Sequence, residues 1–265
     1  MSEPRRPSRS FTDLVEIMAI LRRECPWDRQ QTHESIKDLM VEEIYEAIEA
    51  IDNDDPVELK KELGDLLLHV VFHTEIAREA GRFDIGDVIY GIQEKLIRRH
   101  PHVFADTHAG DSATVVRNWE DLKMKEKERS SVLQGVPDTL PALIKAQRMQ
   151  EKAAAVGFDW QTWEEAWPKL TEEIEEFKLA AQKGDEEEKA GEFGDLLFSM
   201  VNVGRLAGLN SEDCLRLTNR KFKRRFQYIE EVLSKQGKNL KDATLEEMDA
   251  IWDAAKKHFE GESRS

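Results

Sequence analysis

The chain has 265 residues, of which 40% are hydrophobic and 35% charged, so it can form one large or two ordinary globular domains and is too apolar for a disordered chain. Its formal net charge of -15 opposes non-specific binding to nucleic acid or an anionic membrane, and no apolar run of about 18 residues predicts a membrane span. Two distant cysteines, Cys25 and Cys214, indicate no disulfide framework, and no secretory signal is recognisable. We therefore expect a cytoplasmic protein.

Helix-start and helix-stop signals predict successive helices in the first half of the chain. Ser10 and Asp13 resemble a capping box, and Asp55 followed by Pro56 is typical of a helix N-terminus. Gly81 is suited to end the helix that begins at Pro56. The expected elements are a helix after residue 10, helices at 35–51, 56–80 and 85–100, a loop at 101–113 and a charged helix at 114–130.

The second half continues this pattern after a segment, residues 131–141, that we expect to be a linker. Gly157 is suited to end a helix, Gly184 to form a short turn, and Thr244 to open a capping box. The expected helices are 142–156, 168–182, 185–207, 211–236 and a last one from residue 244. Because no sustained alternation of apolar and polar residues occurs, the sequence predicts an all-α fold.

An internal repeat divides the chain into two copies. The segment Glu42–Glu46 resembles Glu172–Glu176, and Glu62–Leu67 resembles Glu192–Leu197, each pair being separated by 130 residues. Basic and aromatic positions farther along recur at similar spacing. The expected arrangement is a flexible tail at 1–10, an N-terminal helical domain at 11–130, a linker at 131–141 and a related C-terminal helical domain at 142–265.

Acidic residues in the second copy are spaced so that they can meet. Glu173 and Glu176 share one face of a helix, while Glu188, Glu192 and Asp195 share one face of the next. A short turn favours antiparallel packing of the two helices, so the acidic faces should converge. Converging carboxylates repel one another, and Mg²⁺, which prefers oxygen ligands, would relieve that repulsion. The lack of thiolate or imidazole partners argues against zinc.

A plainer interpretation is a solvated acidic surface, which is what an isolated Glu-x-x-Glu usually forms. Two features favour a metal site instead. Apolar residues such as Phe193 and Leu197 surround Glu192 and Asp195, which predicts a core helix. The same acids recur at the same separation in the first copy, so chance placement is the weaker explanation.

Basic and aromatic residues follow the acids along the second copy. The basic residues on its later helices are Lys221, Arg224, Arg225 and Lys256. Most such cations only solvate a helix face, but opposite an acidic metal cluster they suit phosphate oxygens. Phe222 and Trp252 could stack on a nucleobase, although such residues more often belong to a core.

Four motifs form a specific combination that covers nearly the whole chain. They are Glu173-x-x-Glu176 with Glu192-x-x-Asp195, Cys25-Pro26-Trp27-Asp28 with Gln31-Thr32-His33, His100-Pro101-His102-Val103-Phe104, and Asn219-x-Lys221-Phe222-x-x-Arg225. Together they resemble the MazG family of nucleoside triphosphate pyrophosphohydrolases. The resemblance implies tandem all-α domains that each contribute to a four-helix bundle, completed by formation of a homodimer. It also implies Mg²⁺-dependent hydrolysis of ribo- and deoxyribonucleoside triphosphates between the α- and β-phosphates, which would limit aberrant or surplus nucleotides.

The resemblance assigns roles to particular residues. The metal ligands would be Glu173, Glu176, Glu192 and Asp195, with Mn²⁺ as a substitute ion and a vestigial second set at Glu43, Glu46, Glu62 and Asp65. The nucleotide would contact Lys169, Glu172, Glu173, Glu188, Lys189, Asp195, Lys221, Phe222, Arg224, Arg225 and Trp252, with Lys256 nearby. We expect water to attack the α-phosphate in line, oriented or deprotonated by Glu172 or Glu175. Lys221 and Arg225 would stabilise the leaving pyrophosphate.

The second copy is expected to do most of the hydrolysis. Leu39 occupies the first-copy position of Lys169, so the first copy lacks one candidate phosphate-binding cation. Pro101 also ends the first basic helix within a turn of Arg99, whereas its counterpart continues. The first copy is therefore expected to be mainly structural.

Other classes of protein need motifs that the sequence lacks. A di-iron bundle would need Glu-x-x-His on helices of its site, a P-loop enzyme its glycine-rich lysine motif, and a His-Asp phosphohydrolase its dipeptide. A non-enzymatic helical scaffold that binds nucleotides or partner proteins stays open as the alternative of a different class.

Overall fold

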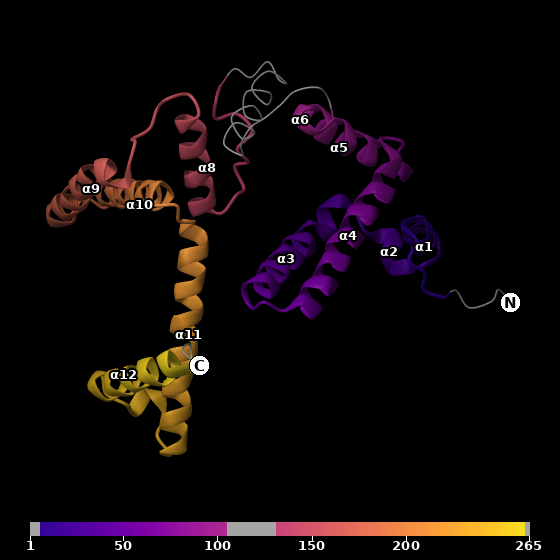
Figure 1. The fold of residues 1–265 in the computed structure, drawn as a ribbon. Coiled ribbons are helices and arrows are strands. Elements are labelled where there is room, and N and C mark those ends of the chain that lie inside the picture. Colours follow the sequence, from indigo (N-terminus) through magenta and orange to yellow (C-terminus); the bar gives the residue numbers. More distant parts are fainter. Residues whose placement is uncertain (1–5, 105–130, 263–265) are drawn as a thin grey trace. The chain divides into compact units, whose positions relative to one another are not determined.

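The computed structural model describes residues 6–104 and 131–262, and the chain divides into two units, residues 1–122 and 123–265. All regular elements in these described ranges are helices, which confirms the predicted all-α class (Figure 1). No helix there combines the length and the apolarity that a membrane crossing requires. Residues 131–141, predicted as a linker, fall within the second unit.

The first unit is built on a hairpin of two long helices. Its elements are α1 (Phe11–Glu24), α2 (Pro26–Gln30), α3 (His33–Asp52), α4 (Pro56–Glu79), α5 (Ile85–Arg99) and α6 (Pro101–Phe104). Helices α3 and α4 form the hairpin, and α1 packs against α4. A core of Met18, Ile36, Val71 and Phe72 fills the space between these three helices. The core fixes the register in which the acidic faces of α3 and α4 meet.

Local signals predicted the ends of these helices. The Ser10 side chain accepts a hydrogen bond from the Asp13 backbone N–H, although the Asp13 carboxylate binds the Ser8 hydroxyl, so only half of the expected capping box forms. Asp55 caps α4, and Gly81 adopts φ +65 just beyond its end. Helix 35–51 and the other expected boundaries, apart from those corrected below, agree with the structure to within two residues.

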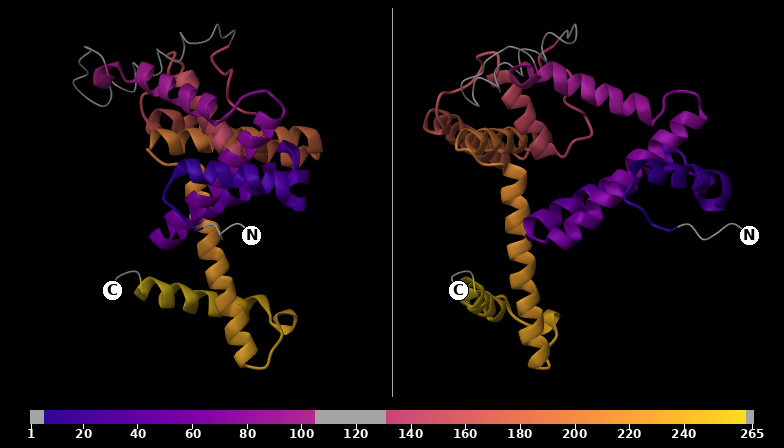
Figure 2. Two further views of the ribbon diagram at one scale, coloured as in Figure 1. Left: turned by 90° about the vertical axis from the view of Figure 1, so that its right-hand side faces the viewer. Right: turned by 45° about the vertical axis from the view of Figure 1, so that its right-hand side comes forward.

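The second unit contains another hairpin and a protruding helical arm. Its elements are α8 (Ala142–Ala154), α9 (Trp163–Lys183), α10 (Glu186–Leu206), α11 (Ser211–Lys235), the 3₁₀ helix η1 (Leu240–Asp242) and α12 (Leu245–Glu262). Gly184, at φ +78, turns α9 into α10, and α8 packs against α10 and α11. Helix α12 packs on α11 at the end away from α9 and α10 (Figure 2).

Two predicted elements need correction. Helix α9 begins at Trp163, not at Pro168, because Thr162 caps it and the early residues Ala166 and Leu170 are buried. Pro168 lies near the start of the helix, where its missing N–H costs one backbone hydrogen bond without breaking the helix. The start of the predicted loop at 101–113 is the short helix α6. The rest of that loop and the helix predicted at 114–130 lie outside the described residues.

The prediction of a core helix around Glu192 is wrong for a single chain. Phe193 on α10 is 47% exposed and Met200 is 52% exposed, and Leu63 at the corresponding place on α4 is 54% exposed. The physical reason is that each hairpin supplies only two long helices, so among the described residues one apolar face of each hairpin has no covering element in its own unit.

Candidate metal and nucleotide site

Three carboxylates of the second hairpin come together. Glu173 and Glu176 extend from α9 and Glu192 from α10, and oxygens of the three groups lie within 4.8 Å of one another. Their convergence follows from the three-residue spacing on α9 and the tight turn at Gly184. Asp195, the fourth predicted ligand, is exposed and lies outside this group of three. We call Glu173, Glu176 and Glu192 the second acidic cluster.

The electrostatics of the second acidic cluster favour a cation. Burial and the negative charge of Glu173 raise the pKa of Glu176, which means that the three carboxylates resist being ionised together. The Lys169 ammonium lies 2.8 Å from Glu173 and 2.9 Å from Glu172, and these bonds raise the pKa of Lys169. One lysine cannot neutralise three carboxylates. The donor set is all oxygen, so it fits a hard divalent cation such as Mg²⁺.

The first hairpin contains a related acidic cluster with a different arrangement. Here Glu43, Glu62 and Asp65 have oxygens within 4.8 Å of one another, and Glu46 lies outside the group. Glu62 is fully buried, and the Lys61 ammonium lies 2.8 Å from it. Burial and hydrogen bonding to Glu62 raise the pKa of Glu43. We call Glu43, Glu62 and Asp65 the first acidic cluster.

Lys61 changes the comparison of the two copies. Leu39 stands on α3 at the position that corresponds to Lys169. The first acidic cluster nevertheless has a lysine, because Lys61 on α4 pairs with Glu62. Gly191 stands at the corresponding position of the second copy, so the two copies place their lysines on different helices. A search for basic residues one position before each ligand would have found Lys61.

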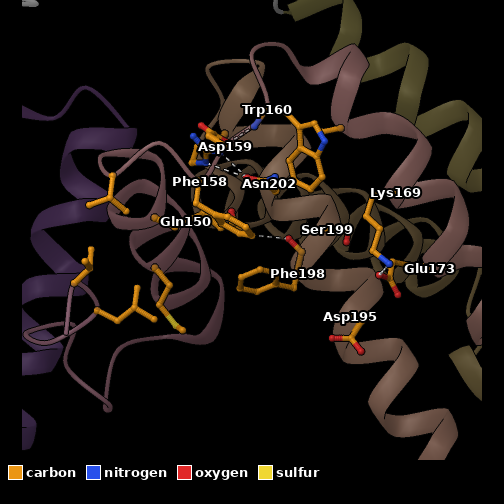
Figure 3. A pocket seen from close by; sticks show the side chains of 17 residues that line it. Gln150, Phe158, Asp159, Trp160, Lys169, Glu173, Asp195, Phe198, Ser199 and Asn202 are labelled. Atoms are coloured by element: carbon orange, nitrogen blue, oxygen red, sulfur yellow. Dashed lines mark hydrogen bonds and ion pairs between the residues drawn. The ribbon is translucent and has the colours of Figure 1, made fainter. Parts of the chain in front are cut away.

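A cavity of about 490 Å³ opens beside the second acidic cluster (Figure 3). Most of its walls are apolar, and Lys169, Glu173 and Asp195 line one side. Side chains from α8, α9, α10 and the segment before α9 contribute to it, among them Gln150, Phe158, Asp159, Trp160, Ala166, Phe198, Ser199 and Asn202. Its volume lies in the range of small-molecule sites, which is roughly 300–1,000 Å³. Val132 and Leu133 also line it, so part of the predicted linker belongs to the cavity wall.

Polar groups at fixed positions face this cavity. Arg205 donates to Asp159 at 2.6 Å and to Asn202 at 2.6 Å, which holds both side chains in place. The Gln150 amide donates to the Phe198 carbonyl at 2.8 Å, while its own Oε1 is buried and has no hydrogen-bond partner among the described residues. The hydrogen bonds made by Gln150 and Arg205 therefore hold the polar part of the cavity wall in a fixed arrangement.

The cavity was not predicted from the sequence. Phe158-Asp159 resembles the Trp27-Asp28 pair of the first copy, but this likeness does not by itself indicate a cavity. The cavity depends on which side chains are small, which a search for charged groups does not detect.

The basic and aromatic candidates form a separate group on α11 and α12. The Phe222 and Trp252 rings have centroids 5.2 Å apart, and the Arg225 guanidinium lies 5.5 Å from the Trp252 ring centre. Arg224 lies 4.0 Å from the Phe259 ring centre, and Lys256 binds Asp253 at 2.7 Å.

This α11–α12 group is displaced from the second acidic cluster. It lies where α12 crosses α11, at the end of the arm away from α9 and α10 (Figure 2). Within one chain, the basic and aromatic residues of α11 and α12 therefore do not lie opposite the second acidic cluster, as was expected from the sequence. The reason is that α11 continues away from the hairpin after α10 ends at Leu206, which residue spacing alone does not specify.

The remaining candidates lie on α9 and α10, where Glu172 and Glu175 are exposed and Glu188 and Lys189 are half-buried. Glu172 shares Lys169 with Glu173 and so lies next to the cluster. The others each pair with a neighbouring side chain at 2.6–2.7 Å: Glu175 with Lys178, Glu188 with Lys183, and Lys189 with Glu186. These pairs place Glu175, Glu188 and Lys189 outside the group of three carboxylates.

Each of the two helical hairpins brings together carboxylates from both of its helices. These features define a class of all-α proteins whose acidic clusters are suited to divalent cations. A comparison with models of protein families identifies one family for both copies of the repeat. The model of the MazG nucleotide pyrophosphohydrolase domain matches residues 31–104 and 161–229, one match in each copy of the repeat. The chain belongs to this family.

The similarity to known proteins extends over most of the chain. It is 48% identical over 250 residues to a nucleoside triphosphate pyrophosphohydrolase/pyrophosphatase MazG of Thermotoga maritima, covering 93% of this chain and 95% of that protein. It is 42% identical over 252 residues to a nucleoside triphosphate pyrophosphohydrolase of Escherichia coli K12, covering 92% and 96%. It is also 49% identical over 235 residues to YabN of Bacillus subtilis, covering 88% of this chain and 48% of that protein.

Proposed function

We propose that the protein hydrolyses ribo- and deoxyribonucleoside triphosphates to the monophosphate and pyrophosphate, using Mg²⁺ at the second copy. The observation that carries this proposal is the second acidic cluster beside the cavity, with Lys169 at their junction. The names of the Thermotoga and Escherichia relatives support the same reaction. By controlling surplus or aberrant nucleotides, such an enzyme would protect the nucleotide pool.

Glu173, Glu176 and Glu192 are the proposed Mg²⁺ ligands, and Asp195 joins them when its exposed side chain turns toward the cluster. Bound Mg²⁺, or Mn²⁺ in its place, would polarise the phosphate and lower the pKa of a bound water. The raised pKa of Glu176 supports this assignment, since a divalent cation would reverse its cause.

The cavity is the proposed position of the nucleobase and sugar. Phe158 and Trp160 supply aromatic surface on which a nucleobase could stack. The triphosphate would then extend past Lys169 toward the second acidic cluster. Lys169 is suited to this because it is charged, lines the cavity and contacts Glu173.

The reaction needs one water and one base. Water attacks the α-phosphorus in line, the bond from that phosphorus to the bridging oxygen breaks, and pyrophosphate leaves with the electron pair. Of the two bases expected from the sequence, Glu172 has the stronger support, because it shares Lys169 with the ligand Glu173. Glu175 is held by Lys178 on another part of the helix surface. Glu172 would accept the proton of the attacking water.

A homodimer would complete the site. The exposed apolar residues of α10 need a cover, and Arg224 and Arg225 of α11 contact rings of α12, which lies at the end of α11 away from α9 and α10. We therefore propose that α11 and α12 of one subunit bring Lys221, Arg225 and Trp252 to the second acidic cluster of the other. Opposite charge on the two surfaces favours this pairing. It also explains why residues with related predicted roles lie apart in one chain.

Mixing two inactive variants tests this arrangement. One variant carries Glu192→Gln and the other carries Lys221→Ala with Arg225→Ala. If the site spans two subunits, each mixed dimer has one intact site, so co-expressed chains should recover about a quarter of the wild-type rate. If the site lies within one chain, mixed dimers that native mass spectrometry detects will remain inactive. A fully active monomer in sedimentation would also contradict the dimer.

Release of pyrophosphate tests the activity itself. Purified chain, mixed nucleoside triphosphates and Mg²⁺ should give pyrophosphate and monophosphates in equal amounts, and chelation of the metal should stop the reaction. Binding of nucleotides without any release would favour the alternative, a non-enzymatic scaffold. Glu192→Gln is the matched control because it changes one oxygen ligand and keeps the shape of the side chain.

The proposed setting is the cytoplasm, without nucleic acid or membrane as a partner. Cys25 and Cys214 are both free thiols, which fits a reducing compartment. The acidic net charge of -15 disfavours polyanionic partners. Separation of cell extracts into cytoplasmic and membrane fractions would check this placement.

A further inference from the structure

Three histidines gather in the first unit, away from any role in the proposed reaction. His33 is the first residue of α3, while His69 and His73 lie one turn apart on α4. The corresponding positions of the second copy hold Trp163, Ser199 and Val203, so the histidine cluster belongs to the first copy alone. We use the name histidine cluster for His33, His69 and His73.

Two of these rings are already in direct contact. The Nδ1 atoms of His33 and His73 lie 2.9 Å apart, and the two rings are nearly parallel, with an interplanar angle of 5°. One nitrogen must donate and the other accept, so at least one of these nitrogens carries no proton. Two imidazoles on a tetrahedral zinc ion have ligand nitrogens roughly 3.4 Å apart, so an ion could enter with an opening of only about 0.5 Å.

His69 lies beside this pair on α4, but the three rings do not bring one nitrogen each within 4.8 Å of one another, so His69 must move to complete a site. Its ring centroid is 6.3 Å from that of His73, and two histidines four residues apart on a helix are a recognised zinc-binding spacing. The His69 side chain is 7% exposed, and its Nδ1 atom is buried with no hydrogen-bond partner among the described residues. A buried nitrogen left in this state is unfavourable, and a metal ion would satisfy it.

We propose that the histidine cluster binds a transition-metal ion of the zinc class, separately from the Mg²⁺ sites. Imidazole nitrogen suits Zn²⁺ and Co²⁺, whereas the acidic clusters offer the oxygen ligands of Mg²⁺. Binding requires the His69 ring to turn toward the His33–His73 pair. The ion would join the start of α3 to the middle of α4 and so stabilise the first hairpin.

The surroundings keep these imidazoles in the form that binds metal. Burial lowers the pKa of His69 and of His73, so both are neutral at neutral pH. The negative charge of Asp65, one turn before His69 on α4, acts in the opposite direction on the pKa of His69. The same carboxylate would favour a bound cation nearby.

Metal binding to the full chain in a large excess of Mg²⁺ tests the proposal. The excess occupies the carboxylate sites, and Zn²⁺ is then titrated by calorimetry against the wild type and single variants. His73→Gln and His33→Gln should each weaken Zn²⁺ binding by more than about 100-fold, since even indirect partners of metal ligands contribute about 10–100-fold. His33 is only half-buried, which makes His33→Gln the variant least able to disturb folding.

Two controls locate the ion. His258→Gln removes a histidine from α12 and should leave Zn²⁺ binding unchanged, as should Glu62→Gln in the first acidic cluster. Co²⁺ in place of Zn²⁺ should give the visible absorption of nitrogen-ligated, tetrahedral cobalt, and His73→Gln should abolish it. Wild-type affinity for Zn²⁺ in both histidine variants would overturn the proposal, and so would loss of binding only in Glu62→Gln.

Discussion

Both copies of the repeat contain an acidic cluster, but they differ in the side chains that lie beside it. Three positions, each pair separated by 130 residues, show the difference: Ile36 and Ala166, His69 and Ser199, Phe72 and Asn202. In the first copy Ile36 and Phe72 are part of the buried core. In the second copy Ala166, Ser199 and Asn202 line the cavity. Small and polar side chains thus leave room for a ligand where the first copy places a well-filled core, which stabilises the fold.

The lysines of the two acidic clusters differ in the same sense. Lys61 holds the buried Glu62 from within α4, while Lys169 reaches Glu173 from the edge of the cavity. A lysine beside a cavity can exchange its carboxylate for a phosphate. Lys61, at the first acidic cluster, mainly occupies the position that a metal ion would take. Charge count alone would not distinguish the copies, but the location of the charge does.

The largest expected difference between the copies is in turnover. Glu192→Gln should lower the rate of pyrophosphate release by more than about 100-fold, because it removes an oxygen ligand. The matched variant Glu62→Gln should keep a rate close to that of the wild type. Both rates are measured at saturating nucleotide and Mg²⁺, and helix content by circular dichroism confirms that each variant is folded. A Glu62→Gln enzyme that loses most turnover while Glu192→Gln keeps it would assign the site to the first copy.

Filling the cavity should have the next largest effect. Asn202→Phe introduces the first-copy residue and also removes an acceptor from Arg205, so we expect kcat/KM to fall by at least about tenfold. Mg²⁺ binding to the acidic cluster, measured by calorimetry, should persist.

The reciprocal change tests the first copy. Phe72→Ala should lower the free energy of unfolding by about 3–5 kcal/mol, with turnover of the folded protein preserved. If Asn202→Phe leaves kcat/KM unchanged, the cavity is not the nucleotide position.

Mg²⁺ binding to the second acidic cluster should weaken as the pH falls, by a smaller factor. The pKa of Glu176 is raised, so this group takes up a proton at a higher pH than an ordinary glutamate. The protonated group repels the neighbouring carboxylates less, but it is a poor ligand for a metal ion. Without metal, its contribution to stability is present at low pH and is lost as the pH rises through the raised pKa. Calorimetric titrations at neutral pH and at about pH 5.5 should show the weakening. Glu176→Gln should make the affinity, although lower, less dependent on pH.

The sequence predicted the helices and the acidic hairpins because those features depend on neighbours along the chain. Asp55 and Gly184 act through local hydrogen bonds and dihedral angles, and a three-residue spacing puts Glu173 and Glu176 on one face in any helix. The match between the copies then located both acidic clusters.

The rest depends on contacts between elements that no local pattern encodes. The direction of α11, which leads away from the second hairpin, depends on how α8 and α12 pack against it. The cavity results from side chains too small to fill the space, so a search for chemical groups does not find it. The apolar pattern of α10 was interpreted as that of a core helix, but one chain leaves this surface exposed.

The smallest expected effect concerns Lys61. Its ammonium lies 2.8 Å from Glu62 and so occupies part of the position that a metal ion would take. Lys61 itself is 61% exposed, so water screens its ion pair with Glu62 and the pair contributes little. Lys61→Ala should therefore strengthen Mg²⁺ binding to the first acidic cluster by no more than about two- to fivefold. Calorimetry on chains that also carry Glu173→Gln would isolate that cluster.

Lys169→Ala is the matched change in the second copy. It should likewise remove a competitor of the metal, but turnover should fall, because the proposed phosphate contact is lost. If Lys61→Ala instead weakens Mg²⁺ binding, Lys61 does not compete with the ion but holds the buried Glu62 in position for it. The two lysines would then differ in helix and location while serving the same purpose, and the contrast between a filled and an open copy would depend on the cavity alone.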